Sequence, residues 1–262
     1  MTEQPTHDWP NAEPVMQPKV KRILIIAGIV IILSIPLVIL FSSAPKSKNV
    51  PATEKKGIDI ATLEQQANSN PTSANIVALS VAYINNNTPG KAIKPLTDLI
   101  KREPNNAIAY NNLGVANIML KNYQAGIDAC SKALQIDTGF QSPKNNLRWG
   151  LDEKKKALTT IQAMEKIMPD KQDQAYFIQL GLLYMQIGNY EKSVAIWKEG
   201  QQKFPSAAAI FYNNMGTAQV LNKEYDKAIE NFNKAINADA NNQLAKNNLA
   251  WALQEKKDNT PQ

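Results

Sequence analysis

Pairs of adjacent asparagines are the most regular polar feature of this 262-residue sequence. The four pairs are Asn111–Asn112, Asn145–Asn146, Asn213–Asn214 and Asn247–Asn248. A carboxamide both donates and accepts hydrogen bonds, so a row of asparagines can hold the main chain of an extended peptide. Inside a helix each asparagine costs up to about 0.7 kcal/mol relative to alanine. The pairs are therefore candidates for peptide contact, and inheritance by duplication without a binding role is the alternative.

Two tryptophans stand close to the second and fourth pairs. Trp149 and Trp251 each follow a leucine by two residues. Large aromatic side chains often anchor a protein partner; packing on the preceding helices is the alternative role. The candidate partner-binding residues are Asn112, Asn146, Asn214, Asn248, Trp149 and Trp251.

Cysteine and histidine are too rare for most catalytic chemistry. Cys130 is the only cysteine and His7 the only histidine. This count excludes an intrachain disulfide, a metal site of several Cys and His ligands, and most pairs of a nucleophile with a histidine base. The sequence also has no phosphate-binding glycine loop. We therefore expect no enzyme activity, no catalytic residues, no metal site and no cofactor.

The elements that carry the asparagines recur along the chain. The clearest copy begins at Ala107, others begin at Gln174 and Ala209, and a weaker one begins at Ser73. In the clearest copy the spaced large and small residues are Tyr110, Leu113, Gly114, Tyr123 and Ala133. This spacing resembles the tetratricopeptide repeat (TPR) family, whose unit is a helix-turn-helix of about 34 residues. The expected fold is all-α, a TPR superhelix with an N-terminal single transmembrane helix.

The resemblance implies where particular side chains lie. In the family the first helix of each unit lines the inner surface of the superhelix, so the asparagine pairs and both tryptophans would face a groove. Gly114, Gly181 and Gly216 would lie where the two helices of a unit touch, and Cys130 would occupy a core position. A peptide held by an asparagine ladder is the use that the resemblance implies.

A longer period shows that the repeats are duplicated. Residues 107–155 and 209–257 share 23 of 49 residues. We expect a first block at 58–157 and a second at 158–257, each ending in a capping helix that begins at Lys144 or Lys246, with a tail at 258–262. No Gly or Pro interrupts Leu151 to Met168. The two blocks are joined there either by one long helix or by a turn near Lys155.

An apolar segment precedes the repeats. Residues 23–41 contain no charge and would span roughly 28 Å as a helix at about 1.5 Å per residue. A cleaved signal sequence is the alternative, but the segment exceeds the usual apolar length of about 7 to 15 residues, and Pro45 would follow the cut. We expect a transmembrane helix, with residues 1–22 as a disordered tail and 42–57 as a basic linker.

Basic residues flank both ends of this segment. Lys19, Lys21 and Arg22 lie directly before it. Long C-terminal domains translocate largely regardless of charge. We therefore expect the N-terminus in the cytoplasm and the repeats in an extracytoplasmic, periplasmic location.

The net charge of +6 does not indicate a nucleic-acid partner. Half of the charge lies in the linker, and no basic stripe with interleaved aromatics follows.

The expected function is a membrane-tethered scaffold or adaptor that binds a protein or peptide partner in the superhelix groove. One alternative is a self-associating structural protein of the envelope, a homo-oligomer. The other is a non-catalytic regulatory subunit of an enzyme or export machine.

Overall fold

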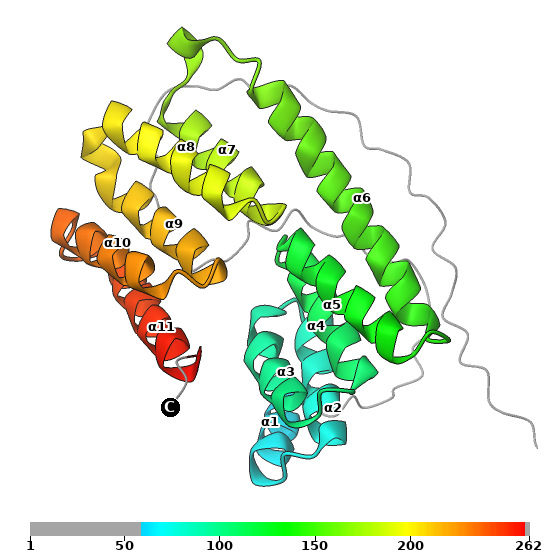
Figure 1. Ribbon diagram of the computed structural model, residues 1–262. Helices are drawn as coiled ribbons and strands as arrows, with labels where there is room; N and C mark the ends of the chain where they lie inside the picture. Colours follow the sequence, from blue (N-terminus) through cyan, green and yellow to red (C-terminus); the bar gives the residue numbers. More distant parts are fainter. Residues whose placement is uncertain (1–58, 260–262) are drawn as a thin grey trace, which may run out of the picture. The chain divides into compact units, whose positions relative to one another are not determined.

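The computed structural model describes residues 59–259, which form eleven α-helices and two short 3-10 helices, with no strand in that range. Figure 1 shows the helices as successive antiparallel hairpins. The helices are α1 (Ile60–Ser69), α2 (Ser73–Asn85), α3 (Gly90–Arg102), α4 (Ala107–Met119), α5 (Tyr123–Ile136), α6 (Gln141–Met164), α7 (Gln174–Gln186), α8 (Tyr190–Lys203), α9 (Ala208–Leu221), α10 (Tyr225–Ala238) and α11 (Gln243–Asn259), with 3-10 turns η1 (Pro169–Lys171) and η2 (Pro205–Ala207). The prediction of an all-α fold is confirmed.

The same turn closes each of the four hairpins α2–α3, α4–α5, α7–α8 and α9–α10. The fifteenth residue of each unit has a left-handed backbone: Asn87 (φ 59°), Lys121 (φ 60°), Gly188 (φ 83°) and Lys223 (φ 61°). A left-handed residue after a helix is a common way to end it. The four units therefore share one turn geometry even where the glycine that favours it has been replaced.

The three interior glycines lie where the two helices of a unit meet. An added Cβ would meet Cys130 Sγ at Gly114, the Trp197 indole at Gly181 and, at 2.6 Å, Phe232 Cε1 at Gly216. Each of these neighbours is fully buried on the second helix of its unit. The predicted role of these glycines in close helix packing is confirmed, and so is the core position of Cys130.

The two halves of the repeat array are joined by a single helix. The 24 residues of α6 run from Gln141 to Met164 without a turn near Lys155, so the long-helix alternative is the correct one. Both capping helices begin three residues before the predicted starts at Lys144 and Lys246. Pro143 fits because the first turn of a helix needs no backbone donor.

The core consists of three clusters that follow one another along the chain. One cluster of buried residues joins α1 to α4, a central cluster joins α4 to α9, and a third joins α9 to α11. Stability in such an array is shared between neighbouring units. The predicted transmembrane helix at 23–41 lies outside the described residues. None of the described helices combines the length and apolar character needed to cross a bilayer.

Candidate functional site

Asparagines form the same bridge between helices in both halves. Asn146 Nδ2 donates to Asn111 Oδ1 at 2.9 Å, and Asn248 Nδ2 donates to Asn213 Oδ1 at 2.9 Å. Both acceptors are buried, so each bridge satisfies a polar group that has left water. The bridge therefore fixes the capping helix, α6 or α11, against the first helix of the preceding unit.

The second asparagine of each interior pair keeps hydrogen-bonding capacity. Asn112 is 8% exposed, and its Oδ1 accepts from Asn111 Nδ2 at 3.2 Å. Its Nδ2 is buried and has no partner. A buried donor without an acceptor costs about 1–3 kcal/mol. Asn112 therefore carries an uncompensated donor in the first half.

Asn214 lies in the wall of a cavity of about 190 Å³ in the second half. The cavity lies between the first helices α7, α9 and α11, with one residue from α8. Its lining residues are Leu182, Met185, Trp197, Asn213, Asn214, Thr217, Leu244, Asn248 and Trp251. Three of the predicted partner-binding residues, Asn214, Asn248 and Trp251, thus come together, and none of the lining residues carries a charge.

Hydrogen bonds and close packing hold the cavity walls. Trp197 Nε1 donates to the main-chain oxygen of Ile178 at 3.3 Å, and the ring rests against Gly181. Thr217 Oγ1 donates to the main-chain oxygen of Asn213 at 3.0 Å. Trp251 Nε1 donates to Glu255 Oε1 at 3.2 Å. Contacts within the protein therefore hold the side chains of Trp197, Thr217 and Trp251 in the cavity wall.

Family models described as tetratricopeptide repeat match residues 77–139 in one case and residues 175–199 and 209–242 in another. The chain belongs to the tetratricopeptide repeat family. The matched segments include the paired asparagines of α4 and α9, and the described hairpins have the family's helix-turn-helix form. No curated protein matches the chain.

Several solved structures resemble this TPR protein at low identity. The crystal structure of MamA is 21% identical and covers 69% of this chain and 86% of its own, with a TM-score of 0.30. The TPR2AB domain of yeast Sti1 in complex with pHSP90 is 20% identical over 76% of this chain and 77% of its own, with a TM-score of 0.35. YrrB, described as a TPR protein with an unusual peptide-binding site, is 18% identical over 72% and 98%, with a TM-score of 0.33. These values are too low to transfer a ligand from those proteins to this chain.

The apolar wall residues were not among the predicted site residues. Leu182, Met185 and Leu244 occupy the ninth, twelfth and second positions of their units. In TPR proteins these positions of the first helix face the groove, so the signal was present in the register. An aliphatic residue at such a position is a weak signal by itself, because any helix can bury one in the core.

Trp149 has more exposed surroundings than its counterpart Trp251. Its side chain is 38% exposed, and Val81, the counterpart of Leu182, is 39% exposed. Ser142 stands where the second half has Leu244. By contrast Trp251 is partly buried against the cluster of Val220, Phe232 and their neighbours. Trp251 therefore packs on the preceding unit and also lines the cavity, whereas Trp149 is more exposed.

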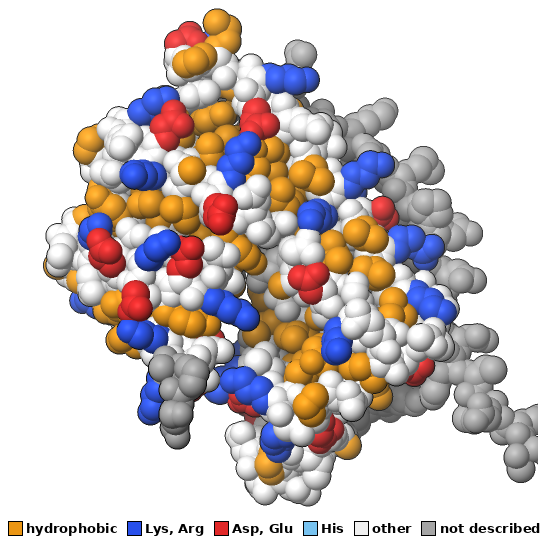
Figure 2. Space-filling model, in the orientation of Figure 1, with side chains coloured by type: hydrophobic (Ala, Val, Ile, Leu, Met, Phe, Trp, Pro, Cys, Tyr) orange, Lys and Arg blue, Asp and Glu red, His pale blue; other side chains and the backbone are white. Residues whose placement is uncertain are grey.

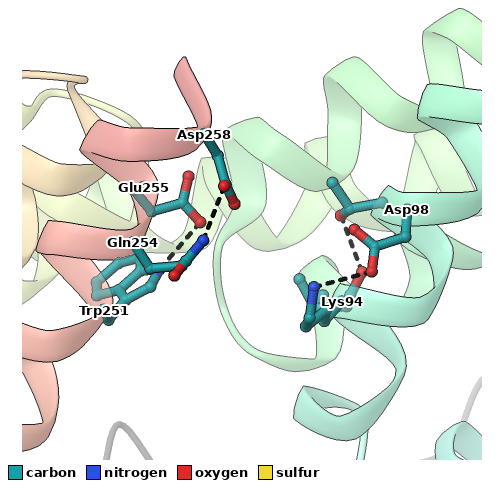
Figure 3. A network of polar contacts seen from close by, with 8 residues as sticks. Lys94, Asp98, Trp251, Gln254, Glu255 and Asp258 are labelled. Atoms are coloured by element: carbon teal, nitrogen blue, oxygen red, sulfur yellow. Dashed lines mark hydrogen bonds and ion pairs between the residues drawn. The ribbon is translucent and has the colours of Figure 1, made fainter. Parts of the chain in front are cut away.

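Charged groups lie beside the cavity on α11 and across from it on α3. Figure 3 shows Glu255 and Asp258 on α11, with Gln254 Nε2 donating to Asp258 Oδ1 at 2.7 Å. On α3, Lys94 Nζ donates to Asp98 Oδ2 at 2.9 Å. This hydrogen bond raises the pKa of Lys94, and the charges of Asp258 and Glu255 add to the rise. These charged groups lie outside the cavity, whose lining residues are all uncharged.

The described residues offer little for other chemistry. No group of three or more His, Cys, Asp or Glu side chains within 59–259 is placed to hold a metal ion. Burial raises the pKa of the Cys130 thiol to about 11, so the thiolate required of a nucleophile is scarce near neutral pH. On the face in Figure 2, basic and acidic side chains are interspersed rather than gathered by sign.

Proposed function

We propose that this TPR protein is a scaffold that binds an extended segment of a partner protein at the second-half cavity. The observation that carries the proposal is the convergence of Asn214, Asn248 and Trp251 on one uncharged cavity. Apolar walls with a few convergent polar groups are typical of ligand sites. Amides are suited to peptide because they match both the donor and the acceptor of a main chain.

The size of the cavity favours a peptide over a free small molecule. Sites for whole small ligands usually measure about 300–1,000 Å³. The cavity here is about 190 Å³, enough for a side chain and too small for most complete metabolites. A peptide would place one side chain inside and leave its remainder on the surrounding helices.

Photocrosslinking in native membranes tests the proposal. A photoreactive amino acid at Asn214 should capture a discrete protein partner, whereas the same residue at exposed Lys198 on α8 should not. The Asn214 position is partly buried in the cavity wall, so capture there requires a ligand at the site. Recovery of lipid alone, or of the same products from both positions, would contradict the proposal.

The proposal includes a membrane tether formed by residues 23–41, with the repeats on the extracytoplasmic side. The support is the uncharged length of the segment and the basic residues Lys19, Lys21 and Arg22 before it. Tethering raises the effective concentration of the scaffold near membrane-bound partners. The full-length protein should resist alkaline extraction from membranes, and protease added to spheroplasts should digest the repeats. Release by alkali would contradict the tether.

Self-association is the second candidate, because apolar residues are exposed on both capping helices. Leu151 on α6 is 51% exposed, and its counterpart Leu253 on α11 is 50% exposed. Sedimentation of the full-length protein in detergent across a hundredfold range of concentration distinguishes the candidates. A scaffold for other proteins should keep a constant mass, whereas a self-assembling protein should gain mass, and Leu253→Lys should prevent the gain.

A further inference from the structure

The cavity walls specify the kind of segment that can occupy the site. We infer that the partner inserts a single large uncharged side chain, of leucine, methionine or phenylalanine size, between α7, α9 and α11. Asn214 and Asn248 then hold the main chain on either side of it. This inference rests on the proposed function and adds the chemical class of the ligand.

The volume sets the size of the inserted group. A cavity of about 150 Å³ with apolar walls accommodates benzene. The cavity here is about 190 Å³ and accommodates a group of that size or slightly larger. An alanine or serine side chain would leave most of it empty, and an empty apolar cavity contributes no contacts to binding.

The composition of the cavity walls determines whether the inserted side chain can be charged. Leu182, Met185, Leu244 and Trp251 supply apolar surface, and the other lining residues are also neutral. A charged side chain would lose its hydration there without meeting an opposite charge, which is expensive. The acids Glu255 and Asp258 lie outside the lining, so they do not offer a partner to a cation inside it.

An inventory of hydrogen bonds identifies the groups left for the ligand. Asn248 Nδ2 donates one hydrogen to Asn213 Oδ1, and the Thr217 hydroxyl donates to the main-chain oxygen of Asn213. This leaves Asn248 Oδ1 as an acceptor, Asn213 Nδ2 as a donor and the Asn214 carboxamide as both, and none of these three groups has a partner among the described residues. A peptide unit supplies one N–H and one C=O, which matches this set.

The corresponding wall of the first half has different side chains, so the inference predicts one anchor site per chain. Counterpart positions hold smaller residues in three places: Val81 for Leu182, Leu96 for Trp197, and Ser142 for Leu244. Val81 and Trp149 are each more than a third exposed. A side chain placed there would stay largely in water and gain little from burial.

Selection from a phage-displayed random peptide library on the detergent-solubilised full-length protein tests the inference. Bound sequences should share one large uncharged residue, and its replacement by alanine or aspartate should weaken binding about tenfold or more. Leu244→Ser, which introduces the first-half residue, should weaken binding similarly. Leu244→Phe should also weaken it by filling the cavity, while Ser142→Leu and Trp149→Ala should leave the affinity unchanged.

The outcomes separate the inference from the proposed function. Peptides that bind without a common uncharged residue, or whose affinity survives both Leu244 variants, would overturn the inference and leave a peptide-binding scaffold. Selection of a charged anchor residue would overturn it too. If no peptide binds and Asn214 also captures no partner, the proposed function fails and the inference fails with it.

Discussion

The capping helices α6 and α11 carry the same asparagine bridge in different surroundings. Each donates from its asparagine to the first helix of the preceding unit. Each also carries a lysine that reaches the second helix of that unit: Lys154 contacts Gln124, and Lys256 contacts Asp226 at 2.5 Å. The polar links between helices have thus been retained while the surrounding apolar side chains have diverged.

The two halves differ in the size of the side chains packed between the two helices of a unit. The second half packs Gly216 against Phe232 with Ala228 nearby, whereas the first half packs Gly114 against Cys130 with Gly126 nearby. At Gly126 an added Cβ would lie 2.5 Å from Ile118 Cγ1, so this position of the first half has no room for an alanine. The two halves therefore carry side chains of different size at the same repeat positions.

Removal of the Trp197 side chain should have the largest effect on stability. Truncation of a buried tryptophan usually costs about 3–5 kcal/mol, and Trp197 is fully buried against Gly181. Leu96→Ala, its counterpart in the first half, should cost about 2–5 kcal/mol. Urea unfolding followed by near-ultraviolet circular dichroism measures both. A loss below 1 kcal/mol for Trp197→Ala would mean that this wall of the cavity is not packed as described.

The asparagine bridges should contribute equally in the two halves. Asn248→Ala and Asn146→Ala each leave a buried carbonyl, that of Asn213 or Asn111, without its donor. We expect each to lower the free energy of unfolding by about 1–3 kcal/mol. The matched control is Asn247→Ala on the exposed side of α11, which should change little. A large loss in only one half would contradict the equivalence of the bridges.

The turn residues should respond in opposite directions. The left-handed backbone of Lys223 costs about 1–2 kcal/mol. A glycine there would avoid this strain but would lose roughly 0.5–1 kcal/mol more in chain entropy on folding. Lys223→Gly should therefore raise the free energy of unfolding by up to about 1 kcal/mol. Gly188→Ala should destabilise, because the new Cβ would also lie 2.8 Å from Gln124 Cβ. Thermal unfolding of both variants checks the signs. Stabilisation by Gly188→Ala would refute the turn geometry.

The last effect concerns alkaline pH. Burial, with a contribution from Glu153, raises the pKa of Tyr123 from 10.0 to about 12. The unfolded chain therefore loses this proton first, so the stabilisation is complete below about pH 10 and is lost as the pH rises towards 12. Urea unfolding at pH 9 and pH 11 should show a smaller pH dependence for Tyr123→Phe than for the unaltered protein. If Tyr123→Phe had the same pH dependence of the free energy of unfolding as the unaltered protein, the raised pKa of Tyr123 would be contradicted.

The repeat register was enough to predict the hairpins, the packing glycines and the core position of Cys130. It also placed the asparagines on the first helices. Once the register of a 34-residue unit is known, each position in the unit has a known helix and a known face of that helix. The cavity could not be obtained in this way. It depends on how deeply Trp197 enters beside Gly181 and on the difference between Leu244 and Ser142, and both are matters of side-chain volume rather than spacing.

The most direct test of the account follows the tryptophans during binding. The protein contains four, Trp9, Trp149, Trp197 and Trp251, and incorporation of 5-fluorotryptophan gives each its own fluorine resonance, assigned with Trp→Phe variants. Addition of a selected peptide should shift the Trp251 resonance and leave that of Trp149 unchanged. A shift at Trp149 with none at Trp251 would contradict the claim that only the second half holds the partner's side chain.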